Sequence, residues 1–148
     1  MVIDMQRYFL DEKSHAYFPE ARKIVGKIAA LIAAYRDAGS DVIFARHALL
    51  RDESPGIMGR WWGDVLRNDN EFSEIIPELR PKRNELVVRK TTYSAFKNTD
   101  LEKKLMASGI EQLVITGVMT HLCCETTARD AFVRDYEVFF VIDATATY

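Results

Sequence analysis

Four side chains that could carry out chemistry follow short apolar runs of the sequence. Asp4, Lys90 and the adjacent pair Cys123 and Cys124 each come soon after such a run. A carboxylate can remove a proton, an amine can hold an anion, and a thiol becomes a nucleophile when it loses its proton. Together these groups would suit a cysteine hydrolase. Taken singly, Asp is most often a turn residue, Lys a solvated one and Cys a small buried hydrophobe.

The apolar runs are short, branched and apolar on both faces, which is typical of buried parallel strands. They are residues 41–45, 86–89, 113–117 and 138–144, and the opening 2–4 is expected to be the tail of a fifth. Parallel strands place their carboxyl ends at one edge of a sheet, where ligands bind. Asp4, Lys90 and the turn 120–124 therefore meet at that edge in the predicted fold.

Helical patterns alternate with the strands. Residues 20–38 place their apolar side chains on one face, and Gly39 ends the pattern. Thr99 and Glu102 have the spacing of a capping box, and Gly109 ends the second helix. The alternation predicts a three-layer α/β/α, doubly wound, mainly parallel sheet of the Rossmann-like kind, formed by residues 1–148 as a single domain.

Composition excludes several classes of function. A net charge of −2 gives no basic surface for nucleic acid, and the longest apolar stretch, 28–35, is too short to cross a bilayer. The N-terminus lacks a signal peptide, and two adjacent cysteines suit neither a disulfide framework nor a zinc site. No glycine-rich phosphate motif is present. We therefore expect a cytoplasmic protein with a small-molecule partner and no cofactor.

The connection 47–84 interrupts the regular alternation. It contains two tryptophans and only fragments of helical periodicity. A connection of this length usually carries function or short helices of its own. It could reach over the substrate, or it could be a surface insertion in which Trp61 and Trp62 fill an apolar patch.

Three segments together resemble the isochorismatase-like superfamily of cysteine hydrolases. They are 2-VIDMQRYF-9, 88-VRKTTYSAF-96 and 116-TGVMTHLCCETTARDAF-132. The resemblance implies the fold already predicted, in an enzyme that hydrolyses a small amide, carbamoyl or ureido compound through a thioester. It also implies homo-oligomers, dimers or tetramers, and a native chain that extends beyond one or both ends of this sequence.

The family's catalytic triad falls on Asp4, Lys90 and Cys123, with Asp4 as the base and Lys90 holding the thiolate. The resemblance gives Cys124 a packing role and implies a cis peptide between Val118 and Met119. It also implies an oxyanion hole formed by the backbone N–H groups of Met119 and Cys123.

Departures from the family bear on the substrate. Nicotinamidases bind a metal through an Asp-x-His pair after the second strand, where this chain reads Ala45-Arg46-His47. We expect no metal. Isochorismatase domains are locally the most similar in pattern, but they carry a small residue in place of Cys123. A vinyl-ether hydrolase in which Asp4 is the acid, or a noncatalytic member that binds a small ligand, are the alternatives.

A substrate pocket is expected at the same edge of the sheet. Its predicted lining residues are Phe9, His47, Trp61, Trp62, Tyr93, Phe96, Met119 and His121. Three arginines are candidates to pair with a substrate carboxylate, although each could simply be solvated: Arg46, Arg51 and Arg60. His15 is expected to be exposed.

Overall fold

The computed structural model describes residues 1–148 and contains one five-stranded sheet. The strands are β1 (Val2–Ile3), β2 (Ile43–His47), β3 (Leu86–Lys90), β4 (Gln112–Val118) and β5 (Glu137–Ala146). Their order is β3-β2-β1-β4-β5, and every neighbouring pair is parallel. The chain builds outward from β1 on one side and then crosses to β4 on the other. The predicted doubly wound α/β fold is therefore confirmed, and its strand order reverses beside β1.

The central strand β1 is short and packs very closely on β4. Gly117 of β4 has φ +118°, and a Cβ atom there would lie 2.0 Å from the carbonyl oxygen of Ile3. No side chain fits in that space, so only glycine allows the two strands to approach. This contact fixes the end of β1 beside the turn that follows β4.

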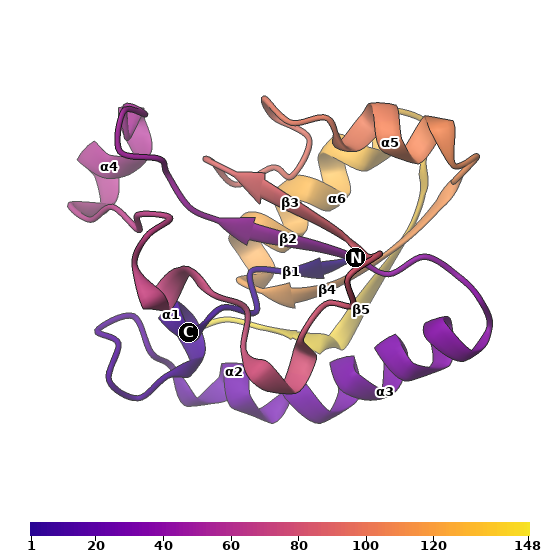
Figure 1. Cartoon of the computed structure of the whole chain (residues 1–148), viewed down its shortest axis with the longest axis horizontal. Helices are drawn as coiled ribbons and strands as arrows, with labels where there is room; N and C mark the ends of the chain where they lie inside the picture. The colour runs from indigo at the N-terminus through magenta and orange to yellow at the C-terminus, as the bar shows by residue number, and fades with distance from the viewer.

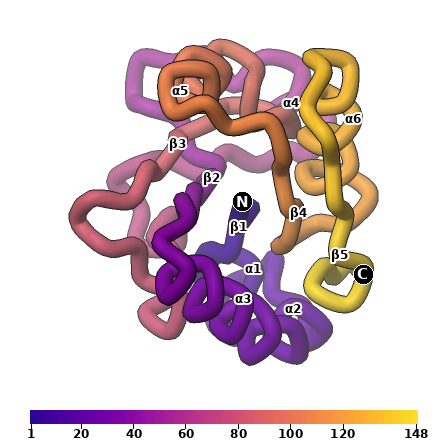
Figure 2. The backbone as a smooth tube through the Cα atoms, turned by 90° about the vertical axis from the view of Figure 1, so that its right-hand side faces the viewer, coloured from indigo at the N-terminus to yellow at the C-terminus, as the bar shows by residue number.

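Helices cover both faces of the sheet (Figure 1). One face carries α2 (Pro19–Lys23) and α3 (Val25–Asp37), and the other carries α5 (Leu101–Ala107) and α6 (Glu125–Phe132). Figure 2 looks toward the amino ends of the strands and shows the sheet between these two layers. Two apolar cores follow from this arrangement. One includes Ile28, Phe44 and Val118, and the other includes Ile3 and Leu101.

The single helix predicted over 20–38 is two helices in the structure. The helix breaks at Ile24, which separates α2 from α3, while its side chain stays buried in the core. The apolar positions on either side keep the same face, so the break does not change how the segment packs. Gly39, with φ +67°, follows α3 as predicted.

The predicted capping box at the second helix is not formed. Thr99 Oγ1 accepts the N–H of Leu101 at 3.3 Å, but the Glu102 carboxylate pairs with Arg134 at 2.7 Å instead of returning to the backbone of Thr99. A tertiary ion pair thus replaces the local hydrogen bond. The helix nevertheless begins at Leu101.

The connection after β2 contains three short helices of its own. They are α4 (Gly56–Trp62) and the 3-10 turns Glu71–Ser73 and Pro77–Leu79. In Figure 1, α4 lies at the end of the molecule toward which the strand arrows point, as does α1 (Arg7–Leu10). Both elements therefore stand at the carboxyl ends of the strands. None of the helices has the length and apolar character needed to span a bilayer.

Candidate active site

Asp4 stands at the switch point, directly after β1. Its backbone has φ +50°, its N–H donates to Ala45 O at 2.9 Å, and its side chain is fully buried. Gln6, two residues on, bridges to β2: its amide oxygen accepts the N–H of His47 at 2.8 Å and its amide nitrogen donates to His47 O at 2.9 Å. These contacts hold the end of β1 against β2, so the carboxylate has a fixed position.

Lys90 ends β3 and is also fully buried. Its ammonium nitrogen lies 2.7 Å from Asp4 Oδ2, and it donates to Cys123 Sγ at 3.2 Å and to Thr92 O at 3.0 Å. The ammonium thus makes two directed hydrogen bonds, to Cys123 and Thr92, and one close contact with a carboxylate. The contact with Asp4 is an ion pair, because neither carboxylate oxygen accepts a directed hydrogen bond.

Cys123 belongs to the π-helical turn Thr120–Cys124 between β4 and α6. The preceding peptide, Val118–Met119, is cis. Met119 O accepts the N–H groups of Leu122 at 3.1 Å and Cys124 at 3.2 Å, whereas the N–H of Met119 donates to no group of the chain. The turn therefore presents Cys123 at the start of a helix and leaves one backbone donor beside it unpaired.

The two cysteines differ in exposure. Cys123 retains 8% of its surface and lines a cavity, whereas Cys124 has none and packs in the core on the α5 and α6 side. Both are free thiols. Only Cys123 can meet a ligand, although the two are neighbours in sequence.

Burial and the neighbouring carboxylate raise the pKa of the Cys123 thiol to about 12, against the opposing effect of Lys90. Burial alone would lower the pKa of Lys90, but the charge of Asp4 outweighs it and the net pKa is raised. The free site thus holds an ammonium and a carboxylate beside a neutral thiol. Lys90 lowers the pKa of the thiol, in the direction expected of a neighbouring cation, while burial and Asp4 act against it.

His47 lies at the end of β2 on the same cavity. Burial and then the charge of Lys90 lower its pKa to about 4, so the imidazole is neutral, and its Nδ1 has no hydrogen-bond partner. Its neighbour Ala45 is buried and supplies no donor atom. Nowhere in the chain do three His, Cys, Asp or Glu side chains converge as metal ligands. These residues do not fit the metal site described for nicotinamidases.

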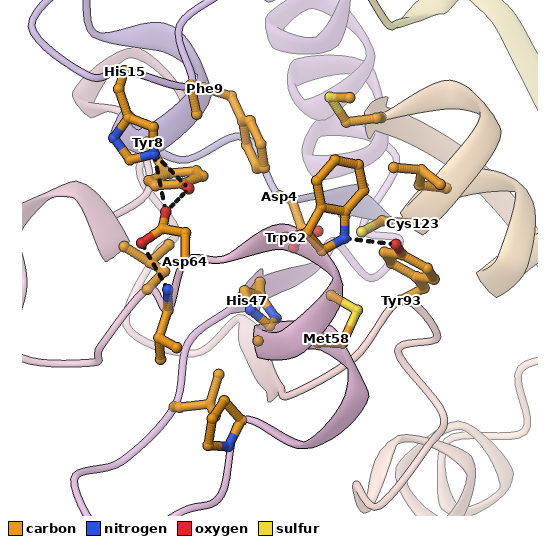
Figure 3. Close-up of a pocket in the computed structure, with 18 of the residues that line it drawn as sticks. Asp4, Tyr8, Phe9, His15, His47, Met58, Trp62, Asp64, Tyr93 and Cys123 are labelled. Atoms are coloured by element: carbon orange, nitrogen blue, oxygen red, sulfur yellow. Dashed lines mark hydrogen bonds and ion pairs between the residues drawn. The ribbon is translucent and has the colours of Figure 1, made fainter.

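The cavity has a volume of about 390 Å³. Asp4, His47 and Cys123 line it, and Figure 3 shows Trp62 of α4 beside Asp4 and Cys123. The indole N–H of Trp62 donates to Tyr93 Oη at 2.8 Å, which ties α4 to the loop after β3. This volume is typical of small-molecule sites, which span roughly 300–1,000 Å³.

The predicted lining is correct in part. The cavity includes Phe9, His47, Trp62, Tyr93 and Met119. Trp61, in contrast, is 75% exposed, because adjacent residues of a helix point in different directions and Trp62 takes the inward one.

Phe96 and His121 also lie outside the cavity. Phe96 is buried in the core, where its ring stacks at a tilt on Tyr136 and lies under the guanidinium of Arg134. His121 is exposed, and its Nδ1 lies 2.8 Å from Thr147 Oγ1. Both predictions are wrong, since the turns after β3 and β4 direct these two side chains away from the ligand space.

The arginine candidates have other partners or no part in the cavity. Arg46 donates to Asn68 Oδ1 at 2.6 Å, Arg51 pairs with Asp69 at 3.0 Å on the surface, and Arg60 is exposed. None of the three lines the cavity, and neither does any other arginine or lysine. A cationic partner for a substrate carboxylate is therefore absent from the walls.

Sequence reasoning missed a polar group at the far side of the cavity. Tyr8 and Asp64 line it together with His15, which is 71% exposed at the side chain but also borders the cavity. Tyr8 lies within the motif 2–9, and that was the one available signal. Nothing in the sequence pairs Asp64 with it, because the contact depends on how the connection after β2 folds back.

The chain matches the isochorismatase domain model over residues 1–148. It is 39% identical to nicotinamidase 3 of Arabidopsis thaliana, over all of this chain and 72% of that protein. It is 35% identical to enterobactin synthase component B of Escherichia coli K12, over all of this chain but only 52% of that protein, so the chain spans about half the length of that relative.

A solved structure of a cysteine hydrolase from Pseudomonas syringae pv. phaseolicola 1448A superposes with a TM-score of 0.95 at 35% identity. The match covers 99% of this chain and 70% of that one. The chain belongs to the isochorismatase family and is a hydrolase of that family.

Proposed function

We propose that the protein is a thiol-dependent amidohydrolase that cleaves the C–N bond of a small carboxamide, carbamoyl or ureido compound. The observation that carries the proposal is the position of Lys90 Nζ, 2.7 Å from Asp4 Oδ2 and 3.2 Å from Cys123 Sγ. Asp4 and Cys123 line the cavity, and Lys90 lies buried behind them. A carboxylate, an ammonium and a thiol in contact are the groups that nucleophilic acyl transfer needs.

The first half of the reaction forms a thioester. Cys123 Sγ attacks the substrate carbonyl carbon while its proton passes to the Asp4 carboxylate. The C–N bond then breaks, Asp4 returns the proton to the departing nitrogen, and ammonia or an amine leaves. Because the thiol is neutral in the free site, with its pKa raised to about 12, the proton leaves as the C–S bond forms.

The anion of the tetrahedral intermediate needs donors. The unpaired N–H of Met119, with the N–H of Cys123, is proposed as the oxyanion hole. Loss of one such donor typically costs about 3–4 kcal/mol of the barrier. The charge of Lys90 stabilises the carboxylate in the form that accepts the proton, since the two are buried together.

Water completes the second half. Asp4 takes a proton from a water molecule as its oxygen attacks the thioester carbonyl, the C–S bond breaks, and the thiolate of Cys123 recovers the proton. The products are the free enzyme and a carboxylic acid, or a carbamic acid when the substrate is a carbamoyl or ureido compound. A catalytic thiol suits a reducing compartment, and we propose that the enzyme works in the cytoplasm.

The walls of the cavity support an amide over isochorismate. Isochorismate carries two carboxylates, and no arginine or lysine lines the cavity to receive them. Burying an unpaired carboxylate is costly. A thiol at position 123 would also have no role in vinyl-ether hydrolysis.

The test is ammonia release from a panel of aromatic and aliphatic carboxamides, with Cys123→Ala and Cys124→Ala compared. Cys123→Ala should reduce kcat roughly a thousandfold or more. Peptide mass spectrometry of the acid-quenched wild type should detect an acyl adduct on the Cys123 peptide. Cys124→Ala is the matched control and should retain activity. Amide hydrolysis that survives in Cys123→Ala, or hydrolysis of isochorismate with no amide turned over, would contradict the proposal.

A further inference from the structure

A second polar cluster lies on the wall of the cavity away from the thiol. Asp64 follows Gly63, whose φ of +66° turns the chain out of α4. Asp64 Oδ2 accepts a short hydrogen bond from Tyr8 Oη and lies 3.0 Å from His15 Nε2, while Oδ1 accepts the N–H of Val65 at 2.7 Å. Figure 3 shows this cluster and Cys123 on opposite sides of the view.

Asp64 is an anion at this position. Burial alone would raise its pKa, but the hydrogen bond from Tyr8, the N–H of Val65 and His15 lower it overall. Burial and the neighbouring carboxylate raise the pKa of Tyr8, so its hydroxyl stays a neutral donor. No lysine or arginine pairs with Asp64, in contrast to Asp4, which is paired with Lys90. The cavity therefore has one negative charge without a permanent cationic partner.

Aromatic rings form a third of the lining. Seven of the 21 lining residues are Phe, Tyr or Trp: Tyr8, Phe9, Tyr17, Phe18, Trp62, Tyr93 and Tyr148. Several meet edge to face, with ring centroids 5.0 Å apart for Tyr8 and Phe9 and 6.4 Å apart for Phe9 and Phe18. Ring faces carry negative partial charge and attract cations, and quaternary ammonium groups are commonly bound by such rings.

We propose that the substrate is an amide whose other end carries an organic cation, and that Asp64 and the aromatic walls recognise that cation. The inference rests on the proposed function, because it assigns the scissile carbonyl to Cys123 and the cation to the opposite side. The hydrogen bonds from Tyr8 and Val65 hold the Asp64 carboxylate in place, so it is oriented before the substrate binds. An anionic substrate would meet a negative charge and no cation, and is disfavoured.

The test uses two amides of the same shape. They are 4-(trimethylammoniomethyl)benzamide and 4-(2,2-dimethylpropyl)benzamide, which differ in one atom, a charged nitrogen in place of carbon. Assays at pH 8 keep histidines in general uncharged. Wild-type kcat/KM should favour the cationic amide by about tenfold, the size expected for a partly exposed cation–π and charge contact. Titration calorimetry with Cys123→Ala should give the same ratio in Kd without turnover.

Asp64→Asn removes the charge and keeps oxygen for Tyr8 to bond. The selectivity ratio should fall well below tenfold in this variant, to the part that the ring faces supply, in kcat/KM and in Kd on the Cys123→Ala background. Asp69→Asn is the matched control, because Asp69 lies in the same connection, pairs with Arg51 on the surface and is not part of the cavity. It should keep the wild-type ratio, and circular dichroism should report the same fold for both variants.

Three results would overturn the inference. One is equal affinity of Cys123→Ala for both amides. Another is an Asp64→Asn variant that folds and keeps the tenfold preference. The third is a preference for 4-(carboxymethyl)benzamide over the cationic amide. The proposed function can fail independently of this inference. If Cys123→Ala prefers the cationic amide but the wild type releases no ammonia from any amide, the cation site is supported and the amidohydrolase activity is contradicted.

Discussion

Lys90 Nζ lies 2.7 Å from Asp4 Oδ2, and both side chains are fully buried. Two charges removed from water in this way depend on each other, because either one alone would lack the partner that offsets its desolvation. The pair therefore links the stability of the fold to the chemistry of the site.

The first prediction concerns this dependence. Lys90→Met or Asp4→Asn should each lower the free energy of unfolding by roughly 3–5 kcal/mol, because each leaves one buried charge alone. The double variant should lose clearly less than the sum of the two. Urea unfolding at pH 7 measures all four proteins.

The exposed pair Lys27 and Asp143, 2.5 Å apart, provides the control, and Lys27→Met should cost far less than either variant of the buried pair. Additive losses in the cycle at Asp4 and Lys90 would mean that the pair is not coupled.

The second prediction concerns the reactivity of the thiol. The pKa of Cys123 is raised to about 12, with burial the larger cause and Asp4 the next. Iodoacetamide should therefore alkylate Cys123 slowly at neutral pH and progressively faster up to pH 10 without a plateau. Cys124, fully buried, should stay unmodified in the folded protein. Peptide mass spectrometry reads both sites.

Variants of Asp4 and Lys90 should change the alkylation rate of Cys123 in opposite directions. Asp4→Asn removes a charge that raises the thiol pKa, so at pH 9 Cys123 should react faster in this variant than in the wild type, although the variant should be inactive. Lys90→Met should react more slowly. A plateau in the wild type with a midpoint below the ~8.5 of a free thiol would instead indicate a preformed thiolate.

Much of the fold could be predicted from the sequence, because its strong signals are local. Branched apolar runs identified the strands, and Gly39 ended a helix as expected. Prediction failed where a tertiary contact replaced a local one. Glu102 pairs with Arg134 instead of closing a capping box, and Ile24 interrupts a helix while its side chain packs in the core.

The residues of the site likewise divide into those that could be predicted from the sequence and those that could not. The end of a strand gives a position, so Asp4, Lys90 and the turn 120–124 could be assigned to one edge of the sheet before their contacts were known. The choice of Cys123 within that turn came from the family resemblance. The direction of a side chain in a loop or short helix is not written in the sequence. Trp61 and Trp62 were therefore predicted alike, although only one faces the cavity, and the role of Asp64 was missed.

The third prediction concerns the stability of the fold at acidic pH. The pKa of His47 is lowered to about 4, from 6.5. Between these values the unfolded chain binds a proton that the folded one does not, so stability falls as pH decreases from 7 to 4. The protonation of His47 alone should lower the free energy of unfolding by roughly 2–3 kcal/mol between pH 7 and pH 4.

His47→Gln keeps a polar side chain but cannot titrate, so its unfolding free energy should fall less steeply than that of the wild type in urea melts at pH 7, 6 and 5. Ring-proton NMR of His47 in the wild type gives the pKa directly. Identical slopes, or a ring that titrates near 6.5, would show that burial does not hold the imidazole neutral.

The last prediction concerns the wall formed by α4. The hydrogen bond from Trp62 Nε1 to Tyr93 Oη, 2.8 Å long, joins α4 to the loop after β3 beside Cys123. Tyr93→Phe removes the acceptor and keeps the ring. A hydrogen bond of this kind contributes about 1 kcal/mol, so KM for an amide substrate should rise about fivefold, with a smaller change in kcat. Trp61→Phe, at the exposed neighbouring position, should leave both constants unchanged. If Tyr93→Phe alters kcat far more than KM, the bond acts on the reacting groups themselves and α4 is more than a wall.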